Sequence, residues 1–323
     1  MIGAGRFRGL VVMGACATFV VACDKRSPNP AAGAPVGSAT SGTSGTSELD
    51  RLCGTTPPAA CGADPTTEYG APQLHVDACK LGGAARAIAE WPQVQAAPSR
   101  PTLASFGATS SGGVYCPAAL GGRPAVVFER HGFTLPAAAA ASLDSASGNF
   151  TLVAVMRYAG TKTPLTEASG IVFQRNEPAA PHFKGPQLGA NFAFAAAPGG
   201  TDLVRTDRLG ISLQFGTEGG VDATRSVSAV TTARVVGPIV VTARRAGATL
   251  ELRVNGALVK RETIPGSFSG GGGNGQPVNV GRTGGENNYF DGALGELVYW
   301  NESRPDAAVV ALEKGLRSKW GLP

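Results

Sequence analysis

Hydrophobic positions after about residue 120 fall into short runs that are separated by clusters of Gly, Pro, Asn, Asp and Ser. Residues 150–156 (FTLVAVM) are apolar at nearly every position, which is typical of a strand buried on both faces near the centre of a sheet. Comparable runs lie at 125–128, 170–173, 191–194, 211–215 and 239–243. Because these runs are short and rich in β-branched and aromatic residues, they predict the strands of an all-β sandwich.

A β-hairpin is predicted around Asn255 and Gly256. Apolar residues at 250, 252 and 254 alternate with polar ones before this pair, and Leu258 and Val259 follow it. Asn followed by Gly favours a type I′ turn, because both residues tolerate positive φ. The alternation therefore predicts a hairpin with one face in the core and the other face in solvent.

One strong helix is predicted, at the end of the chain. Its apolar stripe at helical spacing consists of Val309, Leu312, Leu316 and Trp320. Ser303 is expected to cap it, with Asp306 at the third helical position as in a capping box, and Pro305 is tolerated in the first turn. Gly321 is expected to end the helix. Trp320 is expected to pack on the sandwich as a plug rather than to hold a ligand.

The first residues have the layout of a secretory signal peptide. Arg6 and Arg8 precede an apolar run over residues 9–22, which is too short to span a bilayer comfortably, since spanning needs about 20 residues. The run ends in VVAC at 20–23, which resembles the lipobox of bacterial lipoproteins. In that family the Cys, here Cys23, receives a diacylglycerol, after which the signal peptide, here residues 1–22, is removed. The alternative is an ordinary signal peptide with a chance Cys.

Residues 23–47 are interpreted as the lipidated Cys and a flexible linker, because positions 27–47 are almost entirely Ser, Pro, Ala, Gly and Thr. The predicted location is the bacterial cell envelope, with a lipid anchor in a membrane. Asp24 follows Cys23, and in enterobacterial lipoproteins such an Asp tends to retain the protein in the inner membrane. That rule does not hold in all bacteria, so the choice between inner and outer membrane stays open.

Composition and charge narrow the class of partner. The net charge is +5, but the Lys and Arg residues form no cluster with interleaved aromatics, so nucleic acid is not expected as a partner. The Arg residues are scattered over the predicted strands, where they are expected on solvated faces. The 46 Gly residues fit many short strands joined by turns better than a helical fold.

Four Cys remain once Cys16 leaves with the signal and Cys23 takes lipid. An even number in an exported chain predicts two disulfides, and three connectivities are open. We favour Cys53–Cys61 with Cys79–Cys116, because the shorter loop closes easily. Zinc binding is the disfavoured alternative, since the spacings contain no C-x-x-C pair. Residues 48–119 are interpreted as a Cys-containing N-terminal segment that the disulfides hold on the sandwich.

Six stretches in order resemble the concanavalin A-like lectin/glucanase superfamily, in its laminin-G-like or pentraxin-like branch. They are GRPAVVF at 122–128, FTLVAVMR at 150–157, LRVNGALV at 252–259, VGR at 280–282, FDGALGELVYW at 290–300 and the closing KWG at 319–321. The resemblance implies a two-sheet antiparallel jelly-roll sandwich with a short C-terminal helix over residues 120–323. Residues 48–119 match less well, because the opening segment of that branch cannot be placed around Trp91.

Catalytic motifs are missing from the sequence. Glycosidases of the superfamily carry paired carboxylates as E-x-D-x-E on one strand, and this chain has no such run. Glu296 is the lone acid of its strand and is interpreted as structural, bonded to a neighbouring backbone group. His75, His131 and His182 form no ligand or catalytic motif and are expected at the surface or in loops. The chain is therefore predicted not to be an enzyme.

The richest candidate for ligand binding is the polar loop near residue 285. Its candidate residues are Arg282, Glu286, Asn287, Asn288, Tyr289 and Asp291. They suit sugar hydroxyls or a Ca²⁺ ion with oxygen ligands. Laminin-G-like relatives often bind Ca²⁺, but the resemblance gives no ligand set here, so the metal stays unknown. A plain polar hairpin loop is the competing interpretation.

The sequence thus favours an anchored binding module for carbohydrate or for an envelope or extracellular protein. The alternatives are a diverged glycoside hydrolase and a structural envelope lipoprotein. A hydrolase requires two acids that converge in a groove, and a structural protein requires a flat apolar contact surface. No cofactor is implied, apart from Ca²⁺ at the loop.

Overall fold

The computed structural model describes the sandwich and the segment before it. The described residues are 53–54, 57–94, 102–106, 112–128, 131–144, 148–158, 171–174, 185–190, 193–195, 203–205, 209–214, 226–232, 235–264, 277–282 and 289–323. They lie in one compact unit that extends from Gly45 to Pro323. None of the helices among these residues has the length and apolar character needed to cross a membrane.

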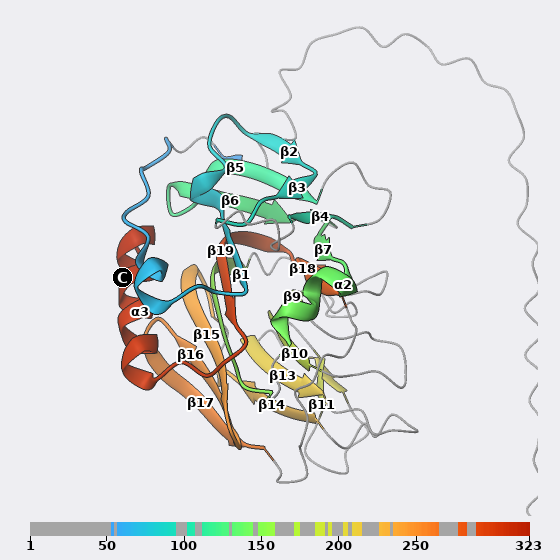
Figure 1. The fold of residues 1–323 in the computed structure, drawn as a ribbon. Helices are drawn as coiled ribbons and strands as arrows, with labels where there is room; N and C mark the ends of the chain where they lie inside the picture. Colours follow the sequence, from blue (N-terminus) through green and yellow to red (C-terminus); the bar gives the residue numbers. More distant parts are fainter. Residues whose placement is uncertain are drawn as a thin grey trace, which may run out of the picture. The chain divides into compact units, whose positions relative to one another are not determined.

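The larger sheet has nine strands, in the order β17-β16-β15-β8-β19-β6-β5-β2, with β1 paired to β19 (Figure 1). These strands are β1 (Leu74–Asp77), β2 (Arg86–Ile88), β5 (Gly113–Leu120), β6 (Arg123–Phe128), β8 (Phe150–Tyr158), β15 (Pro238–Ala246), β16 (Thr249–Val254), β17 (Ala257–Thr263) and β19 (Gly292–Trp300). All its described pairings are antiparallel. The first half of β19 pairs with β6, and β1 pairs with the second half.

The second sheet has eight strands, in the order β14-β13-β10-β9-β18-β7-β4-β3. They are β3 (Glu90–Trp91), β4 (Leu103–Ser105), β7 (Phe133–Leu135), β9 (Ile171–Gln174), β10 (Gly185–Ala190), β13 (Leu209–Gln214), β14 (Ser226–Val230) and β18 (Val278–Val280). A separate pair consists of β11 (Ala193–Ala195) and β12 (Leu203–Arg205). The predicted fold class, a two-sheet antiparallel sandwich with a C-terminal helix, is confirmed.

The central strands are those with the longest apolar runs. β8 lies between β15 and β19, and seven of its nine residues are buried. β19 is buried at all nine positions. This outcome confirms the prediction that residues 150–156 form a central strand, because only a strand covered on both faces tolerates apolar side chains at successive positions.

The hairpin turn forms as predicted, but its polar face does not. Asn255 and Gly256 have φ values of 50° and 86°, and they join β16 to β17. Leu250 and Leu252 lie in the core, whereas Glu251, expected in solvent, is only 3% exposed. The expectation of a wet face was wrong for β16, because the C-terminal helix α3 (Asp306–Trp320) covers it, whereas Arg261 of β17 is 55% exposed.

Buried arginines on β15 correct a second expectation. Arg244 and Arg245 are each 5% exposed rather than solvated. The guanidinium of Arg244 donates to Glu251 and to the carbonyl of Arg304, and it also pairs with Asp306. These contacts tie the start of α3 to the sheet, and Figure 1 shows α3 running beside β15 and β16.

The ends of α3 differ from each other in how well they were predicted. Pro305 is the N-cap and no side chain caps the helix, so the prediction of a Ser303 cap with Asp306 at the third position was wrong. Asp306 is the first helical residue, and it pairs with Arg244 instead of capping. Gly321 ends the helix in the left-handed region, as predicted. The whole predicted apolar stripe is buried, including Trp320.

The segment before residue 120 contributes strands to both sheets. Four short helical turns precede or separate strands in the described residues, two before residue 120 and two after it. These turns are η1 (Pro65–Tyr69), η2 (Ala78–Lys80), α2 (Ala137–Ala140) and η3 (Ala141–Leu143). Two disulfides link this segment, Cys53–Cys116 and Cys61–Cys79. The favoured pairing of Cys53 with Cys61 was wrong. β5 carries Cys116 into the core beside Cys53, and η2 places Cys79 beside Cys61, so strand position and not loop length decides the partners.

Candidate functional site

The predicted loop site is described only at its two ends. Arg282 follows β18, and it forms an isolated β-bridge with Tyr289. Asp291 stands directly before β19 and is partly exposed. Glu286, Asn287 and Asn288 lie outside the described residues, as do Cys23 and His182.

Arg282 lies against aromatic rings at this end of the sandwich. Its guanidinium carbon is 3.5 Å from the ring centroid of Phe106 and 5.3 Å from that of Tyr289. Arg282 is 9% exposed, while both rings are partly exposed. We call Phe106, Arg282 and Tyr289 the Arg282 rim. A planar cation over an aromatic face is held in a fixed orientation by electrostatic attraction to the ring.

Packed aromatic side chains support the Arg282 rim from below. Phe128, Tyr158 and Gly292 are at matching register positions where β6, β8 and β19 meet. Phe290 packs against the rings of both Phe128 and Tyr158, with centroid distances of 5.8 and 6.4 Å. Gly132 leaves room for Arg282, since a Cβ there would lie 2.5 Å from the Arg282 Cγ. The position of the Arg282 stem is therefore set by tight packing.

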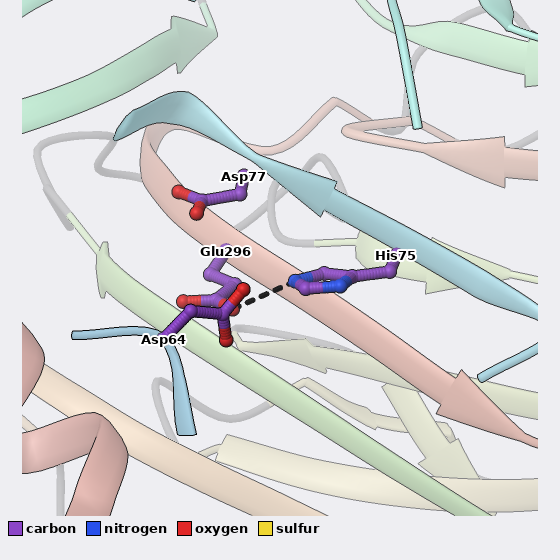
Figure 2. A group of neighbouring side chains, drawn as sticks. All are labelled: Asp64, His75, Asp77 and Glu296. Atoms are coloured by element: carbon purple, nitrogen blue, oxygen red, sulfur yellow. Dashed lines mark hydrogen bonds and ion pairs between the residues drawn. The ribbon is translucent and has the colours of Figure 1, made fainter. Parts of the chain in front are cut away.

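A second polar group lies between the larger sheet and α3, where β1 meets β19. Asp64, His75, Asp77 and Glu296 each offer an atom within 4.8 Å of the others (Figure 2). The register of β1 on β19 places Asp77 directly opposite Glu296. His75, Asp77 and Glu296 are at most 1% exposed. Together with Lys319 and Trp320, these four residues are called the buried cluster.

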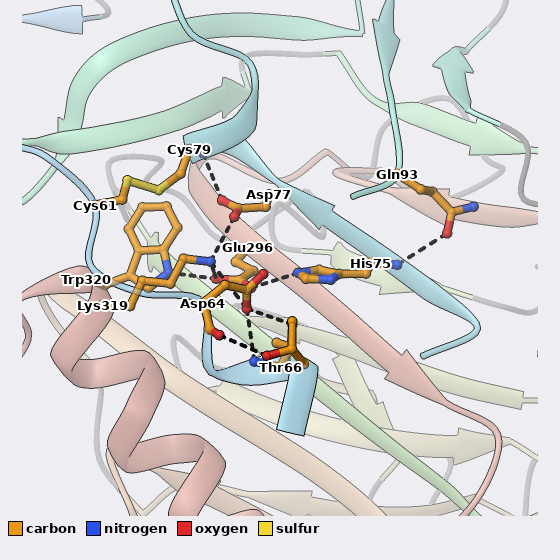
Figure 3. Close-up of polar contacts among 11 residues, drawn as sticks. Cys61, Asp64, Thr66, His75, Asp77, Cys79, Gln93, Glu296, Lys319 and Trp320 are labelled. Carbon is orange, nitrogen blue, oxygen red and sulfur yellow. Dashed lines mark hydrogen bonds and ion pairs between the residues drawn. A yellow bond between two sulfur atoms is a disulfide. The ribbon is translucent and has the colours of Figure 1, made fainter. Parts of the chain in front are cut away.

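Lys319 supplies the positive charge of the buried cluster. Its Nζ donates to Asp77 Oδ2 and to Glu296 Oε2, both at 2.8 Å, and lies 3.9 Å from Asp64 Oδ1 (Figure 3). An ammonium group thus stands among the carboxylates where a cation would bind. Because buried carboxylates need a paired charge and hydrogen bonds, the arrangement fits Lys319 without a metal ion.

Glu296 is the centre of this network. It accepts from His75 Nε2 and from Trp320 Nε1, each at 2.8 Å, in addition to Lys319. The expectation that Glu296 bonds to backbone was wrong, since the partners are three side chains. The expectation of a surface His75 was wrong as well, because β1 enters the larger sheet and buries every one of its residues.

The two buried acids have opposite tendencies to ionise. Burial raises the pKa of Glu296, but the hydrogen bond from His75 and the charge of Lys319 outweigh it, so the pKa lies below its ordinary value. For Asp77, burial and the Glu296 charge outweigh Lys319, and the pKa lies above its ordinary value. Burial lowers the pKa of Lys319, but both carboxylates overcome it and the net shift is upward. Glu296 is therefore the more acidic of the two groups, and Asp77 takes up a proton more readily than Glu296.

Short local structures position the remaining members. Asp64 is the N-cap of η1 and accepts from the backbone N–H and the hydroxyl of Thr66, at 2.9 and 2.6 Å. Asp77 is the N-cap of η2 and accepts from the backbone N–H of Cys79 at 2.8 Å. Cys79 is also bonded to Cys61, so a disulfide borders the buried cluster.

Sequence reasoning missed His75, Asp77 and Lys319 as members of one group. They come from β1 and from the last turn of α3, which are far apart in the chain. Asp77 carried one local signal, because an acid two residues before a Cys at the end of a strand can cap a turn. His131 is half-buried, and its Nδ1 has no hydrogen-bond partner among the described residues.

A model of the concanavalin A-like lectin/glucanases superfamily matches residues 183–310, less than half of the chain. No curated protein matches the sequence. Domain 4 of a GH43 extracellular arabinanase from Geobacillus stearothermophilus is 15% identical with a TM-score of 0.40, over 63% of this chain and 82% of that chain. The Ruminococcus gnavus IT-sialidase CBM40 is 12% identical with a TM-score of 0.40, over 75% and 100%.

A third similar structure is that of botulinum neurotoxin type C, reported for its interaction with ganglioside molecules. It is 10% identical with a TM-score of 0.37, and the match covers 60% of this chain but only 40% of the toxin chain. Because these similarities are distant, the architecture is assigned from the sheet order and the strand pairing of this chain and not from the similar structures. The fold is a two-sheet antiparallel sandwich with a C-terminal helix.

Proposed function

We propose that the chain is a lipid-anchored binding module of the bacterial envelope that recognises carbohydrate at the Arg282 rim and does not catalyse a reaction. The observation that carries the proposal is the stacking of Arg282 on Phe106 beside Tyr289. Partly exposed aromatic faces next to a fixed hydrogen-bond donor are the usual lining of a site for a small polar ligand. The match to the lectin/glucanases superfamily is consistent with this assignment.

The absence of catalysis is inferred from what the buried acids contact. Glycoside hydrolysis needs two carboxyl groups that flank the bond to be cut. Within the described part of the chain, the fully buried acids instead meet cations. Glu296 and Asp77 contact Lys319, Glu251 contacts Arg244, and Glu313 contacts Arg253. Acids that are paired in this way link strands of the larger sheet to one another and to α3, and we infer that they face no substrate.

A glycan array tests the binding proposal. The purified full-length chain in detergent micelles is applied with Ca²⁺ and, separately, with EDTA. We expect reproducible binding to one sugar class, and we expect Arg282→Ala and Tyr289→Ala each to lower the signal at least about tenfold, the loss of one good contact. Glu262→Ala, which changes a surface residue of β17, is the matched control and should bind like the original chain.

The outcomes separate the alternatives. Loss of binding in EDTA would assign a metal to the loop after Arg282. A blank array in both conditions would contradict carbohydrate recognition and direct attention to a protein partner in the envelope. Hydrolysis of an arrayed glycan would contradict the non-catalytic assignment.

The lipid anchor needs its own experiment. Cells that express the chain are fed a labelled fatty acid, and we expect label on the original chain but none on Cys23→Ala. Equal labelling of both chains, or of neither, would refute lipidation at Cys23. Arg282→Ala should incorporate label normally, which keeps this test independent of ligand binding.

A further inference from the structure

The Lys319 amine is held against two carboxyl groups in a region without access to water. Its Nζ is 2.8 Å from Asp77 Oδ2 and 2.8 Å from Glu296 Oε2. The three side chains are 1%, 0% and 0% exposed. An amine next to a carboxyl group condenses only when water is excluded and protons are carried between the groups, and both conditions are present here.

The neighbouring side chains give the carboxyl groups of Glu296 and Asp77 different chemical roles. Glu296 is held by His75 and Trp320, which favour its charged form. Asp77 faces that charge and therefore takes up a proton more readily, which makes its carboxyl carbon the better electrophile. The backbone N–H of Cys79 donates to the other oxygen of Asp77, Oδ1, at 2.8 Å. A donor in that position stabilises negative charge that develops on the oxygen during attack.

We propose that Lys319 and Asp77 become joined by an intramolecular isopeptide bond, with Glu296 as the proton carrier. The Glu296 carboxylate carries one proton from the Lys319 ammonium to Asp77 Oδ2, and the neutral Nζ attacks Cγ of the protonated Asp77 side chain. A C–N bond forms while charge collects on Oδ1, against the Cys79 N–H. Glu296 then carries the second proton from nitrogen to Oδ2, which leaves as water, and Glu296 is again a carboxylate. One amine and one carboxylic acid thus give one amide and one water, with no oxidant or cofactor.

Lys319 carries its charge at rest, because both carboxylates raise its pKa. Proton transfer to Glu296 therefore precedes each attack, and the bond is expected to form slowly after folding. The product is favoured because a neutral amide replaces a buried ammonium and a buried acid, whose desolvation is costly. The bond would join the last turn of α3 to the end of β1 covalently.

Peptide mapping of the purified full-length chain tests the proposal. After reduction, alkylation and trypsin digestion, an unmodified chain is cut at Arg51, Lys80, Arg317 and Lys319. The isopeptide bond protects Lys319 from cleavage. We expect a branched peptide in which residues 52–80 are joined to residues 318–323, with a mass one water below the sum of the two. Fragmentation should place the branch at Asp77.

Three variants make the result specific. Lys319→Arg keeps the charge but cannot form the bond, so the branched peptide should disappear. Asp77→Asn releases ammonia instead of water and should give a branched peptide of identical mass. Glu296→Gln should slow formation about a hundredfold, the usual contribution of a positioned acid–base group. Formation of the Cys61–Cys79 disulfide in each variant reports that the surrounding structure has folded.

Linear peptides 52–80 and 318–319 in place of the branched product, from the original chain, would overturn the proposal. A branch to the peptide 283–314, which contains Glu296 because trypsin does not cleave between Arg304 and Pro305, would overturn the assignment of Asp77, since it would show that Glu296 is the acyl partner. A branched peptide that persists in Lys319→Arg would also overturn it.

Discussion

The buried cluster and the Arg282 rim use charged side chains in opposite ways. In the buried cluster, Lys319 of α3 meets two carboxylates of the larger sheet, and all three groups are shielded from water. At the rim, Arg282 meets the faces of two partly exposed rings. Removal of one partner from a buried ion pair leaves the other charge without compensation. Removal of a cation that stacks on an aromatic ring leaves only the neutral ring. The comparison teaches that the cation of the buried cluster is held by ion pairs with carboxylates, whereas the cation of the Arg282 rim is held against aromatic rings.

The largest expected effect comes from Glu296→Ala. This change deprives Lys319, His75 and Trp320 of their common acceptor, and we expect a loss of about 3–5 kcal/mol in the free energy of unfolding. Urea unfolding followed by tryptophan fluorescence measures it. Glu262→Ala breaks a surface pair with Lys260 and should cost at most about 1 kcal/mol. Similar losses in both variants would erase the distinction between core and surface charges.

Gly295→Ala is expected to be the next largest. A Cβ on Gly295 would lie 2.6 Å from Trp320 Cη2 and 2.9 Å from Leu120 Cδ2, so the added methyl group overpacks the contact of α3 with β19. The expected loss in unfolding free energy is about 1–3 kcal/mol. If the ring contact is the cause, the double variant with Trp320→Phe should lose less than the sum of the two single variants. Strict additivity would rule out this explanation.

Arg282→Ala should separate binding from stability. We expect a loss of about 1 kcal/mol in unfolding free energy, because the change removes the stacking of the guanidinium on Phe106. Binding to the glycan found on the array should nevertheless be lost. A loss of stability as large as that of Glu296→Ala would show that Arg282 is a structural residue and would remove the contrast between the two regions.

The smallest expected effect is pH-dependent and concerns Asp64. Burial raises the pKa of Asp64, but hydrogen bonds from Thr66 and the charge of Lys319 outweigh it and hold the pKa below 3.8. A lowered pKa stabilises the fold above pH 3.8, and this contribution is lost as pH falls through the folded-state value. Thr66→Val removes the hydroxyl donor, so it should cost about 0.5–1.5 kcal/mol at pH 7.

The difference in unfolding free energy between the Thr66→Val variant and the original chain should then disappear at acid pH. Unfolding free energies measured at pH 7 and below pH 3.8 would show this change. A difference that stays constant with pH would mean that the hydroxyl acts through packing and not through Asp64 ionisation.

The sequence predicts those features that depend on local pattern. The Asn255 turn, the central β8 and the apolar stripe of α3 all follow from residues close together in the chain, and each prediction is confirmed. The burial of Arg244 and Glu251 did not follow, because it depends on which face α3 covers. A strand with alternating polar and apolar residues has the same sequence pattern whether its polar face contacts water or a helix.

The buried cluster was out of reach for a related reason. Glu296 stands in a recognisable strand, but its partners His75 and Lys319 are brought to it by the pairing of β1 and by the end of α3. Strand register across two hundred positions leaves no local trace. The disulfides failed in the same way, since Cys116 reaches Cys53 only after β5 has joined the sheet.

The place of β1 beside β19 has a consequence for how the molecule can be assembled. The His75–Glu296 contact joins positions that are 221 residues apart, close to the full length of the sandwich. Such long-range pairing makes folding slow and cooperative, because the entropy of closing the chain is lost before the contact forms. A growing chain therefore remains incomplete until its last strand and helix have been made. Removal of α3 from the C-terminus would leave Asp77 of β1 without Lys319. It would also open the buried face of β19 around Glu296 to water.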